Sequence, residues 1–295
     1  MENAVEINGL TKKYKDFTLD VSANVPKGFS TALIGANGAG KTTLIDILCG
    51  VTVKSGGETV YFGKMTDTDD DALRNRIGYC TAANYFPLGW KLKNVAECMA
   101  IGFDSFDKAR FTKLCETWKL GSPDDRKQKE MLKMSDGNRM RAALAAVLAR
   151  DTDLLVLDEP ASSLDPLARD MLCEQFREYL AGKDGERTIL FSTHNIADME
   201  LATDYAIFMA GGRVIEQGFV EDLKEKYILV HGDAQNGSKA KPLMLSYSVN
   251  STAFEGTALA EDTANLEAVG AINERPTLQQ LSVGILRKAE EDAGN

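Results

Sequence analysis

The segment from Gly35 to Thr43, with the sequence GANGAGKTT, constrains the fold of this chain more than any other stretch. It follows an apolar run at 29–34 that we expect to be a buried strand, and it precedes residues 44–48, which have helical spacing and no breaker. Strand, glycine-rich turn and helix form the context in which the pattern G-x-x-x-x-G-K-[ST] cradles phosphate groups. The glycines let backbone N–H groups face inward, and the helix start adds its positive dipole end. The sequence therefore predicts a triphosphate-binding loop.

Two side chains of this loop have predicted roles of their own. Lys41 is expected to reach the β- and γ-phosphates, and the Thr42 hydroxyl is expected to hold Mg²⁺. The predicted loop residues are Gly35, Ala36, Asn37, Gly38, Ala39, Gly40, Lys41, Thr42 and Thr43.

Charge and composition exclude several classes of protein. The net charge of −10 argues against a nucleic-acid coat, which needs a basic face. Only two histidines occur, so a multi-histidine metal site is excluded, and the five cysteines are expected to be reduced thiols. No apolar run is long enough for a membrane-spanning helix, and the N-terminus lacks a signal core. We therefore expect a cytosolic location.

The order of the predicted elements indicates an α/β fold. Residues 4–28 alternate apolar and polar side chains, which predicts antiparallel strands. Residues 94–150 read as an inserted, mostly helical subdomain. Apolar strands at 154–157 and 188–192, separated by a helix at 167–180, predict a largely parallel sheet. We expect one domain over 1–230, then a linker at 231–241 and a small C-terminal α+β domain within 231–295.

Acidic and imidazole side chains follow the two buried strands of the second half. Asp158 and Glu159 come directly after the strand at 154–157, at the sheet edge where ligands bind in such folds. Asp158 is expected to hold Mg²⁺, mostly through water, and Glu159 to orient and deprotonate the attacking water. His194 ends the next strand, and we expect it to meet the γ-phosphate.

A second anion-binding feature precedes the alanine-rich helix that ends near Arg150. The segment at 134–138, MSDGN, combines the Ser135 hydroxyl, the Gly137 N–H and a helix N-terminus, which together can bind an anion.

With these motifs in this order, residues 4–230 resemble the nucleotide-binding subunit of an ABC transporter. The phosphate loop at 35–42, the signature at 134–138, the Walker B strand ending in Asp158 and Glu159, the D-loop at 162–165 and the switch residue His194 follow the family order. The resemblance implies a P-loop ATPase core with an N-terminal antiparallel β subdomain. It also implies that Tyr14 stacks on adenine. In this family two domains dimerise head to tail, so each ATP would lie between one phosphate loop and Ser135 and Gly137 of the other subunit.

The sequence departs from the family pattern at three positions. Asp136 stands where the signature has its first glycine, and a carboxylate near a triphosphate would cost binding unless it points away. Ala82 stands where a glutamine or glutamate is usual in the Q-loop, with Asn84 as the nearest amide. Ser163 replaces a frequent glycine in the D-loop.

The resemblance implies an ATPase subunit that powers a separately encoded membrane exporter through MgATP-dependent dimerisation. The expected partners are an integral-membrane permease and a second ABC ATPase subunit, in a homodimer or a heterodimer, with no nucleic acid. The expected location is cytoplasmic, peripheral on the inner face of the cell membrane. The tail, from Asp204 onward, is similar to ATPases of small bacterial ABC-2-type exporters of the Ytr and phenol-soluble-modulin kind. Two alternatives stay open: a soluble ABC-type ATPase, for example in iron–sulfur assembly, and a partly degenerate subunit of a heterodimer.

Overall fold

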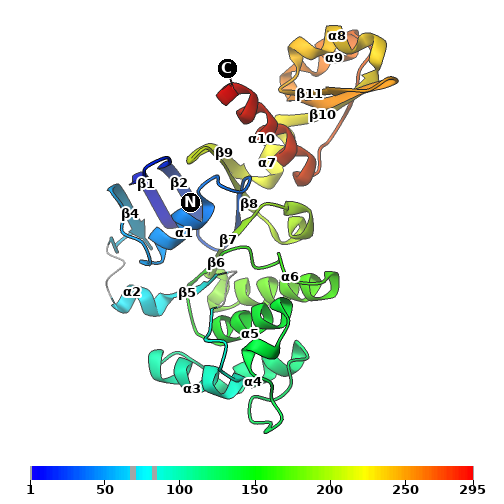
Figure 1. Cartoon of the computed structure of the whole chain (residues 1–295). Helices are drawn as coiled ribbons and strands as arrows, with labels where there is room; N and C mark the ends of the chain where they lie inside the picture. Colours follow the sequence, from blue (N-terminus) through cyan, green and yellow to red (C-terminus); the bar gives the residue numbers. More distant parts are fainter. Residues whose placement is uncertain (1, 67–70, 82–84, 295) are drawn as a thin grey trace.

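The computed structural model describes residues 2–66, 71–81 and 85–294. The strands of these residues form three sheets, of three, six and four strands. Figure 1 shows the three-stranded sheet at the left of the view, the six-stranded sheet at the centre and the four-stranded C-terminal sheet at the upper right.

The first sheet is antiparallel and has the order β2-β1-β4. Alternate residues of β2 are buried, as the period-two pattern at 4–28 predicts, and the buried face packs on the helix that follows the phosphate loop. This sheet therefore places residues 14–17, the loop between its first two strands, beside the phosphate loop. Its strands are β1 (Asn3–Lys13), β2 (Thr18–Pro26) and β4 (Gly56–Tyr61).

The second sheet is the centre of the fold and has the order β5-β6-β7-β3-β8-β9. Its pairs are parallel except for the β8–β9 hairpin. Every residue of β3, β6 and β7 is buried, which explains why these strands are apolar runs without alternation. The carboxyl ends of these three neighbours lie at one edge. The strands are β3 (Ser30–Ile34), β5 (Ile77–Cys80), β6 (Leu154–Leu157), β7 (Thr188–Thr193), β8 (Tyr205–Ala210) and β9 (Arg213–Phe219).

Helices pack on this sheet and extend away from it. Helix α5 is buried on nearly all sides from Ala142 to Leu148, because it lies among β5, α3 and α4. Helices α3, α4 and α5 gather at the end of the molecule opposite the C-terminal sheet (Figure 1), which agrees with the predicted helical region at 94–150. The helices and 3-10 turns up to residue 226 are α1 (Lys41–Leu48), α2 (Asp71–Arg76), α3 (Leu92–Gly102), α4 (Lys108–Thr117), η1 (Met131–Lys133), α5 (Asp136–Leu148), α6 (Pro166–Leu180), η2 (Lys183–Gly185), η3 (Ile196–Asp198), η4 (Glu200–Ala202) and α7 (Val220–Lys226).

The third sheet is antiparallel, has the order β11-β12-β10-β13, and buries its own small core around Val230, Phe254 and Leu266. The elements are β10 (Tyr227–Asp233), η5 (Ala234–Asn236), α8 (Gly237–Ala240), η6 (Lys241–Leu243), β11 (Ser246–Val249), β12 (Ala253–Leu259), η7 (Ala260–Asp262), α9 (Thr263–Ala268), β13 (Ile272–Glu274) and α10 (Leu278–Gly294).

The linker predicted at 231–241 is wrong. Strand β10 continues to Asp233, and two 3-10 turns with a short helix fill the rest. The segment at 231–241 is polar in composition, but its small residues are packed in the C-terminal region. Ala240 is fully buried, and a Cβ at Gly237 would lie 2.3 Å from the Tyr247 hydroxyl oxygen. The division of the chain at 230/231 stays a prediction, and its boundary cuts through a continuous strand.

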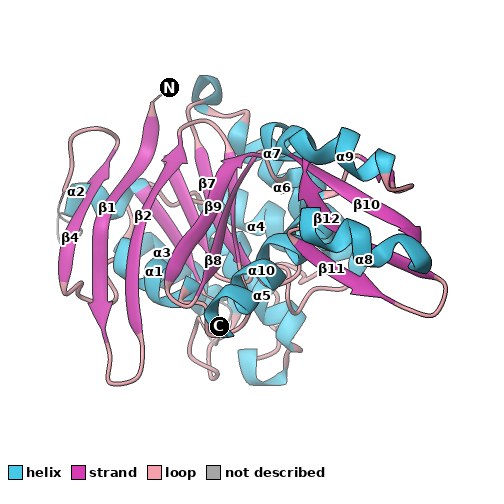
Figure 2. Cartoon of the chain, turned by 90° about the horizontal axis from the view of Figure 1, so that it is seen from above, coloured by secondary structure: helices cyan, strands magenta, loops and turns pink. Residues whose placement is uncertain are grey.

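Helix α10 returns from the C-terminal sheet to the central sheet. Leu278 and Leu281 are fully buried in the main core, and the helix contacts β8 and β9. Figure 2 shows α10 between these strands and the C-terminal sheet. The last helix therefore ties the two regions together.

Candidate active site

The phosphate loop has the geometry that its glycines predict. It connects β3, which ends at Ile34, to α1, which begins at Lys41. Gly40 is the N-cap of α1 with φ 101°, and a Cβ there would lie 2.9 Å from the Phe17 ring. A Cβ at Gly35 would lie 2.5 Å from the Met209 carbonyl oxygen. Only glycine fits at these two positions without a rearrangement.

Lys41 is buried at the base of this loop, with 6% of its surface exposed. Its Nζ donates hydrogen bonds to the Gly35 carbonyl at 2.8 Å and the Ala36 carbonyl at 3.2 Å, and lies 3.6 Å from Glu159 Oε1. Burial lowers the pKa of the Lys41 ammonium, and the carboxylates of Glu159 and Asp158 oppose that shift. The loop therefore holds a cation beside its own N–H groups.

Asp158 is brought to the same place by β6, with 4% of its surface exposed. It accepts hydrogen bonds from the Thr42 hydroxyl at 2.9 Å and the Ser192 hydroxyl at 2.5 Å. A hydroxyl and a carboxylate are ligands that Mg²⁺ prefers, and this ion commonly takes few protein ligands beside substrate phosphates and water. No cluster of three or more His, Cys, Asp or Glu side chains that could hold a metal occurs among the described residues. The Thr42–Asp158 pair therefore fits Mg²⁺ bound together with a phosphate group.

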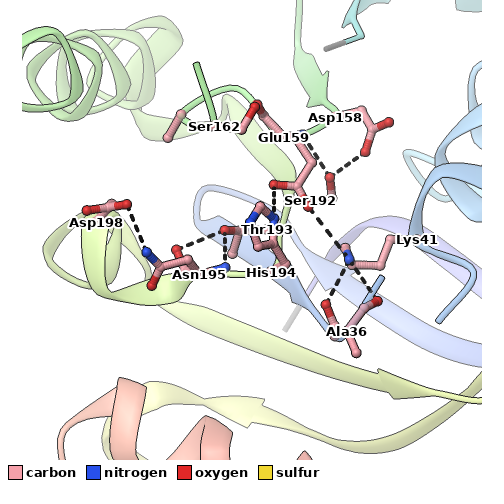
Figure 3. A network of polar contacts seen from close by, with 12 residues as sticks. Ala36, Lys41, Asp158, Glu159, Ser162, Ser192, Thr193, His194, Asn195 and Asp198 are labelled. Atoms are coloured by element: carbon pink, nitrogen blue, oxygen red, sulfur yellow. Dashed lines mark hydrogen bonds and ion pairs between the residues drawn. The ribbon is translucent and has the colours of Figure 1, made fainter. Parts of the chain in front are cut away.

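Glu159 and His194 meet at the ends of adjacent parallel strands (Figure 3). His194 Nδ1 lies 2.8 Å from Glu159 Oε2, while the other carboxylate oxygen faces Lys41. The Glu159 N–H donates to the Ser192 hydroxyl at 2.9 Å, and its φ of 50° is in the left-handed region, uncommon for a residue with a side chain. Ser192 therefore bonds both acidic residues, although the sequence analysis gave it no role in the site. The signal that could have identified it is its position two residues before His194, at the end of strand β7.

A cavity of about 530 Å³ runs from the phosphate loop to an aromatic end. Tyr14 is 48% exposed at that end, and its ring centroid lies 6.4 Å from that of Phe17, a residue that the sequence analysis did not assign to the site. The cavity is lined by Tyr14, Phe17, Asn37, Gly38, Ala39, Gly40, Lys41, Thr42, Thr43 and Glu159.

Ser135 and Gly137 do not line this cavity. Ser135 is the N-cap of α5 and accepts a hydrogen bond from the Asn138 N–H at 3.3 Å. A Cβ at Gly137 would lie 2.8 Å from the Ser163 carbonyl oxygen, so the signature packs against the D-loop.

The Asp136 carboxylate is bonded by Arg139 one turn along α5, and Arg141 bonds Asp165 at the end of the D-loop. Ala82 and Asn84, the predicted Q-loop departures, lie outside the described residues.

Comparison with known proteins places this geometry in a family. The family described as "ABC transporter" matches residues 18–162, which include the phosphate loop, the signature and both acidic residues. An uncharacterized ABC transporter ATP-binding protein of Synechocystis sp. is 30% identical over 280 residues, covering 92% of this chain and 75% of that protein. The chain belongs to the ABC transporter family. Its relatives in that family are described as ATP-binding proteins.

Other members of the ABC transporter family are similar over most of this chain. An uncharacterized ABC transporter ATP-binding protein of Nostoc sp. is 31% identical over 219 residues, 73% of this chain and 64% of that protein, so this chain spans less than two thirds of its length. The Nod factor export ATP-binding protein I of Cupriavidus pinatubonensis is 29% identical, covering 76% of this chain and 69% of that protein.

Solved ABC transporter structures confirm the α/β fold of the cassette. The ATP-binding subunit of an ABC transporter is similar with a TM-score of 0.66 and 26% identity, covering 75% of this chain and 92% of that one. CbiO1 from Clostridium perfringens, part of the transporter complex CbiONQ, has a TM-score of 0.60 and 26% identity, covering 76% and 91%. No helix in the described ranges has the length and apolar character needed to cross a membrane.

Proposed function

We propose that this chain binds MgATP in the 530 Å³ cavity and hydrolyses it. The observation that carries the proposal is the convergence of three groups at that cavity. Lys41, Thr42 and Glu159 line it. Asp158 is bonded to Thr42, and His194 is bonded to Glu159. These groups come from three neighbouring parallel strands and the loop between β3 and α1. Tyr14 and Phe17 at the other end supply apolar surface for a base.

The residues divide the reaction between them. Lys41 exchanges its bonds to the loop carbonyls for phosphate oxygens and stabilises charge on the γ-phosphate. Thr42 and Asp158 would hold Mg²⁺, which would offset the negative charge of the phosphates. Glu159 takes a proton from the attacking water while the oxygen of that water forms a bond to the γ-phosphorus. The bond between the γ-phosphorus and the β–γ bridging oxygen breaks, which yields ADP and phosphate. His194, bonded to Glu159, holds the carboxylate and meets the γ-phosphate.

A second subunit would complete the site. Ser135 and Gly137 stand at the N-terminus of α5, outside the cavity of their own chain. A hydroxyl, an N–H group and the dipole of a helix of this length suit a γ-phosphate presented by another copy or by a related subunit. We infer that the chain works as a head-to-tail dimer in which each ATP lies between two subunits.

We further propose that the ATPase powers a membrane permease as an exporter from the inner face of the cell membrane. The similarity to the Nod factor export protein supports export. The alternatives are a soluble ABC-type ATPase and a partly degenerate subunit of a heterodimer. Purification from native membranes distinguishes the exporter ATPase from the soluble ATPase, because an integral-membrane partner supports export and its absence favours a soluble role. Cooperative hydrolysis by the purified chain alone would rule out the degenerate subunit.

The activity itself is tested with two variants. Lys41→Ala is expected to lose most ATP affinity, and Glu159→Gln to keep ATP affinity while its hydrolysis rate falls by about 10² or more. Fluorescent-ATP titration measures the first and phosphate release the second. Hydrolysis near the wild-type rate in Glu159→Gln would remove Glu159 from the role of base.

A further inference from the structure

A second cavity, of about 700 Å³, lies where α10 returns to the central sheet. Its walls come from β2, from the β8–β9 hairpin, from the start of β10 and from α10. Figure 2 shows α10 between the hairpin and the C-terminal sheet, and Figure 1 shows the same neighbours. Apolar side chains of three separate segments line it: Ile215, Leu245 and Ile285. None of its lining residues has a role in the proposed reaction.

The charged groups of this second cavity are mostly engaged with one another. Lys288 Nζ lies 2.8 Å from Asp292, and Glu216 accepts hydrogen bonds from Lys226 and from the Tyr227 hydroxyl, both at 2.5 Å. Arg213 differs. It lines the cavity, is exposed, and has no ion pair or hydrogen bond to another side chain in the part of the chain that the structure describes.

We propose that this second cavity binds a small amphipathic organic anion. The apolar body of the ligand lies against Ile215, Leu245 and Ile285, and its single anionic head is bonded by Arg213, whose planar fork suits a carboxylate or sulfonate. Asp20, a lining carboxylate without an ion-pair partner among the described residues, disfavours a second negative group. The site therefore selects a monoanion with an apolar body over a polyanion such as a nucleotide.

The turn between β8 and β9 separates this second cavity from the proposed ATP site. Ala210, Gly211 and Arg213 line the second cavity, whereas the Gly212 N–H donates to the carbonyl of Ala39, a residue of the phosphate loop, at 3.1 Å. The Gly212 carbonyl accepts from the Asp20 N–H at 2.8 Å, so the turn is held from both sides.

The turn has little freedom to move independently. A Cβ at Gly212, where φ is 79°, would lie 2.2 Å from the Thr18 carbonyl oxygen and 3.1 Å from the Phe17 ring of the ATP cavity. A ligand that shifts or rigidifies the turn thereby changes nucleotide affinity, and nucleotide changes ligand affinity by the same factor.

Two ten-carbon amphiphiles of opposite charge test the binding. Decanoate and decyltrimethylammonium are titrated below their micelle concentrations into the purified full chain, without nucleotide, by isothermal calorimetry. We expect one decanoate per chain, bound at least about tenfold more tightly than the cation, because a charge-assisted bond to Arg213 is worth about this factor. Equal affinity for both amphiphiles, or no saturable decanoate binding, overturns the proposal.

Three variants locate the bound decanoate. Arg213→Gln is expected to weaken it about tenfold, while Arg287→Gln, an exposed arginine of α10 outside the cavity lining, leaves it unchanged. Asp20→Asn is expected to keep or tighten binding. Thermal unfolding of each variant checks that it is folded. Decanoate binding that Arg213→Gln leaves unchanged contradicts the site.

Coupling has its own measurement. The affinity for ADP is expected to change by about fivefold or more, in either direction, when decanoate is saturating, and Arg213→Gln abolishes that change. An unchanged ADP affinity with decanoate bound overturns the coupling. Failure of ADP to bind at all would contradict the proposed ATPase function and would leave the decanoate result standing.

Discussion

Arg139 bonds the carboxylate of Asp136 across the first turn of α5. Asp136 occupies the position at which the family signature has a glycine, and its charge would oppose a triphosphate. Arg139 is itself held, since its Nη1 donates to the Met134 carbonyl at 3.3 Å. A carboxylate in the first turn of a helix is also favoured by the helix dipole. The signature thus carries its acidic residue as one half of an ion pair.

The first prediction follows from this pair. Arg139→Gln frees the Asp136 carboxylate, and we expect ATP-driven dimerisation in a Glu159→Gln background to weaken by about threefold, because an exposed charge acts through a high dielectric. The second change Asp136→Gly should restore it. Size-exclusion chromatography with ATP measures the dimer fraction, and Arg126→Gln, an exposed arginine, is the matched control. Equal dimerisation by Arg139→Gln and the double variant would contradict the idea.

The second prediction concerns His194. His194→Ala removes the bond to Glu159 and a proposed contact with the γ-phosphate, so phosphate release should fall by about 10² while ATP affinity stays within about twofold. His231→Ala is the control, because this other histidine lies on β10. A loss of ATP affinity as large as the loss of rate would assign His194 to binding rather than to the chemical step.

The third prediction concerns Ser192, whose buried hydroxyl bonds both Asp158 and the Glu159 N–H. Ser192→Ala leaves a carboxylate oxygen and an N–H without this partner, so the free energy of unfolding should fall by about 1–3 kcal/mol. Chemical denaturation of the nucleotide-free chain measures it. Ser162→Ala removes an exposed hydroxyl bonded to the Glu159 carbonyl and should cost less than about 0.5 kcal/mol. Equal losses of unfolding free energy in Ser192→Ala and Ser162→Ala would contradict a stabilising role for the buried Ser192 hydroxyl.

The fourth prediction concerns Glu200, which joins α10 to the core. Its carboxylate accepts from the Leu278 N–H at 2.8 Å and from Lys224 at 3.1 Å. Burial alone would raise the pKa of Glu200, but these donors hold it below its ordinary value of 4.5. Since the pKa in the folded state is lowered, the stabilisation is present above pH 4.5 and is lost as pH falls through the folded-state value.

Glu200→Gln should therefore lower the free energy of unfolding by about 1 kcal/mol at pH 7, with faster hydrogen exchange in α10. Its difference from wild type should shrink as pH falls below about 4.5. Glu97→Gln, which breaks an exposed pair with Lys93 on α3, is the control and should have little effect. A pH-independent difference would exclude the carboxylate charge as the cause.

Local patterns predicted much of the fold and of the candidate site. The phosphate loop, Asp158 and Glu159 could be placed because strand, turn and helix follow one another directly in the sequence. Phe17 and Ser192 received no site role, because their functions arise only when separate segments meet. Small residues misled the prediction at 231–241, since Gly237 and Ala240 resemble a linker in composition but are packed beneath the sheet.

Glu159 has its backbone in the left-handed region, which is strained for a residue with a side chain. The carboxylate that the proposed reaction needs therefore lowers the stability of the fold. Glycine adopts that φ without strain, and asparagine tolerates it better than glutamate does. A library randomised at position 159 and selected only for heat resistance should therefore enrich these two residues. The survivors would fold more firmly and hydrolyse almost nothing, so any directed evolution of this protein has to couple its thermal selection to turnover.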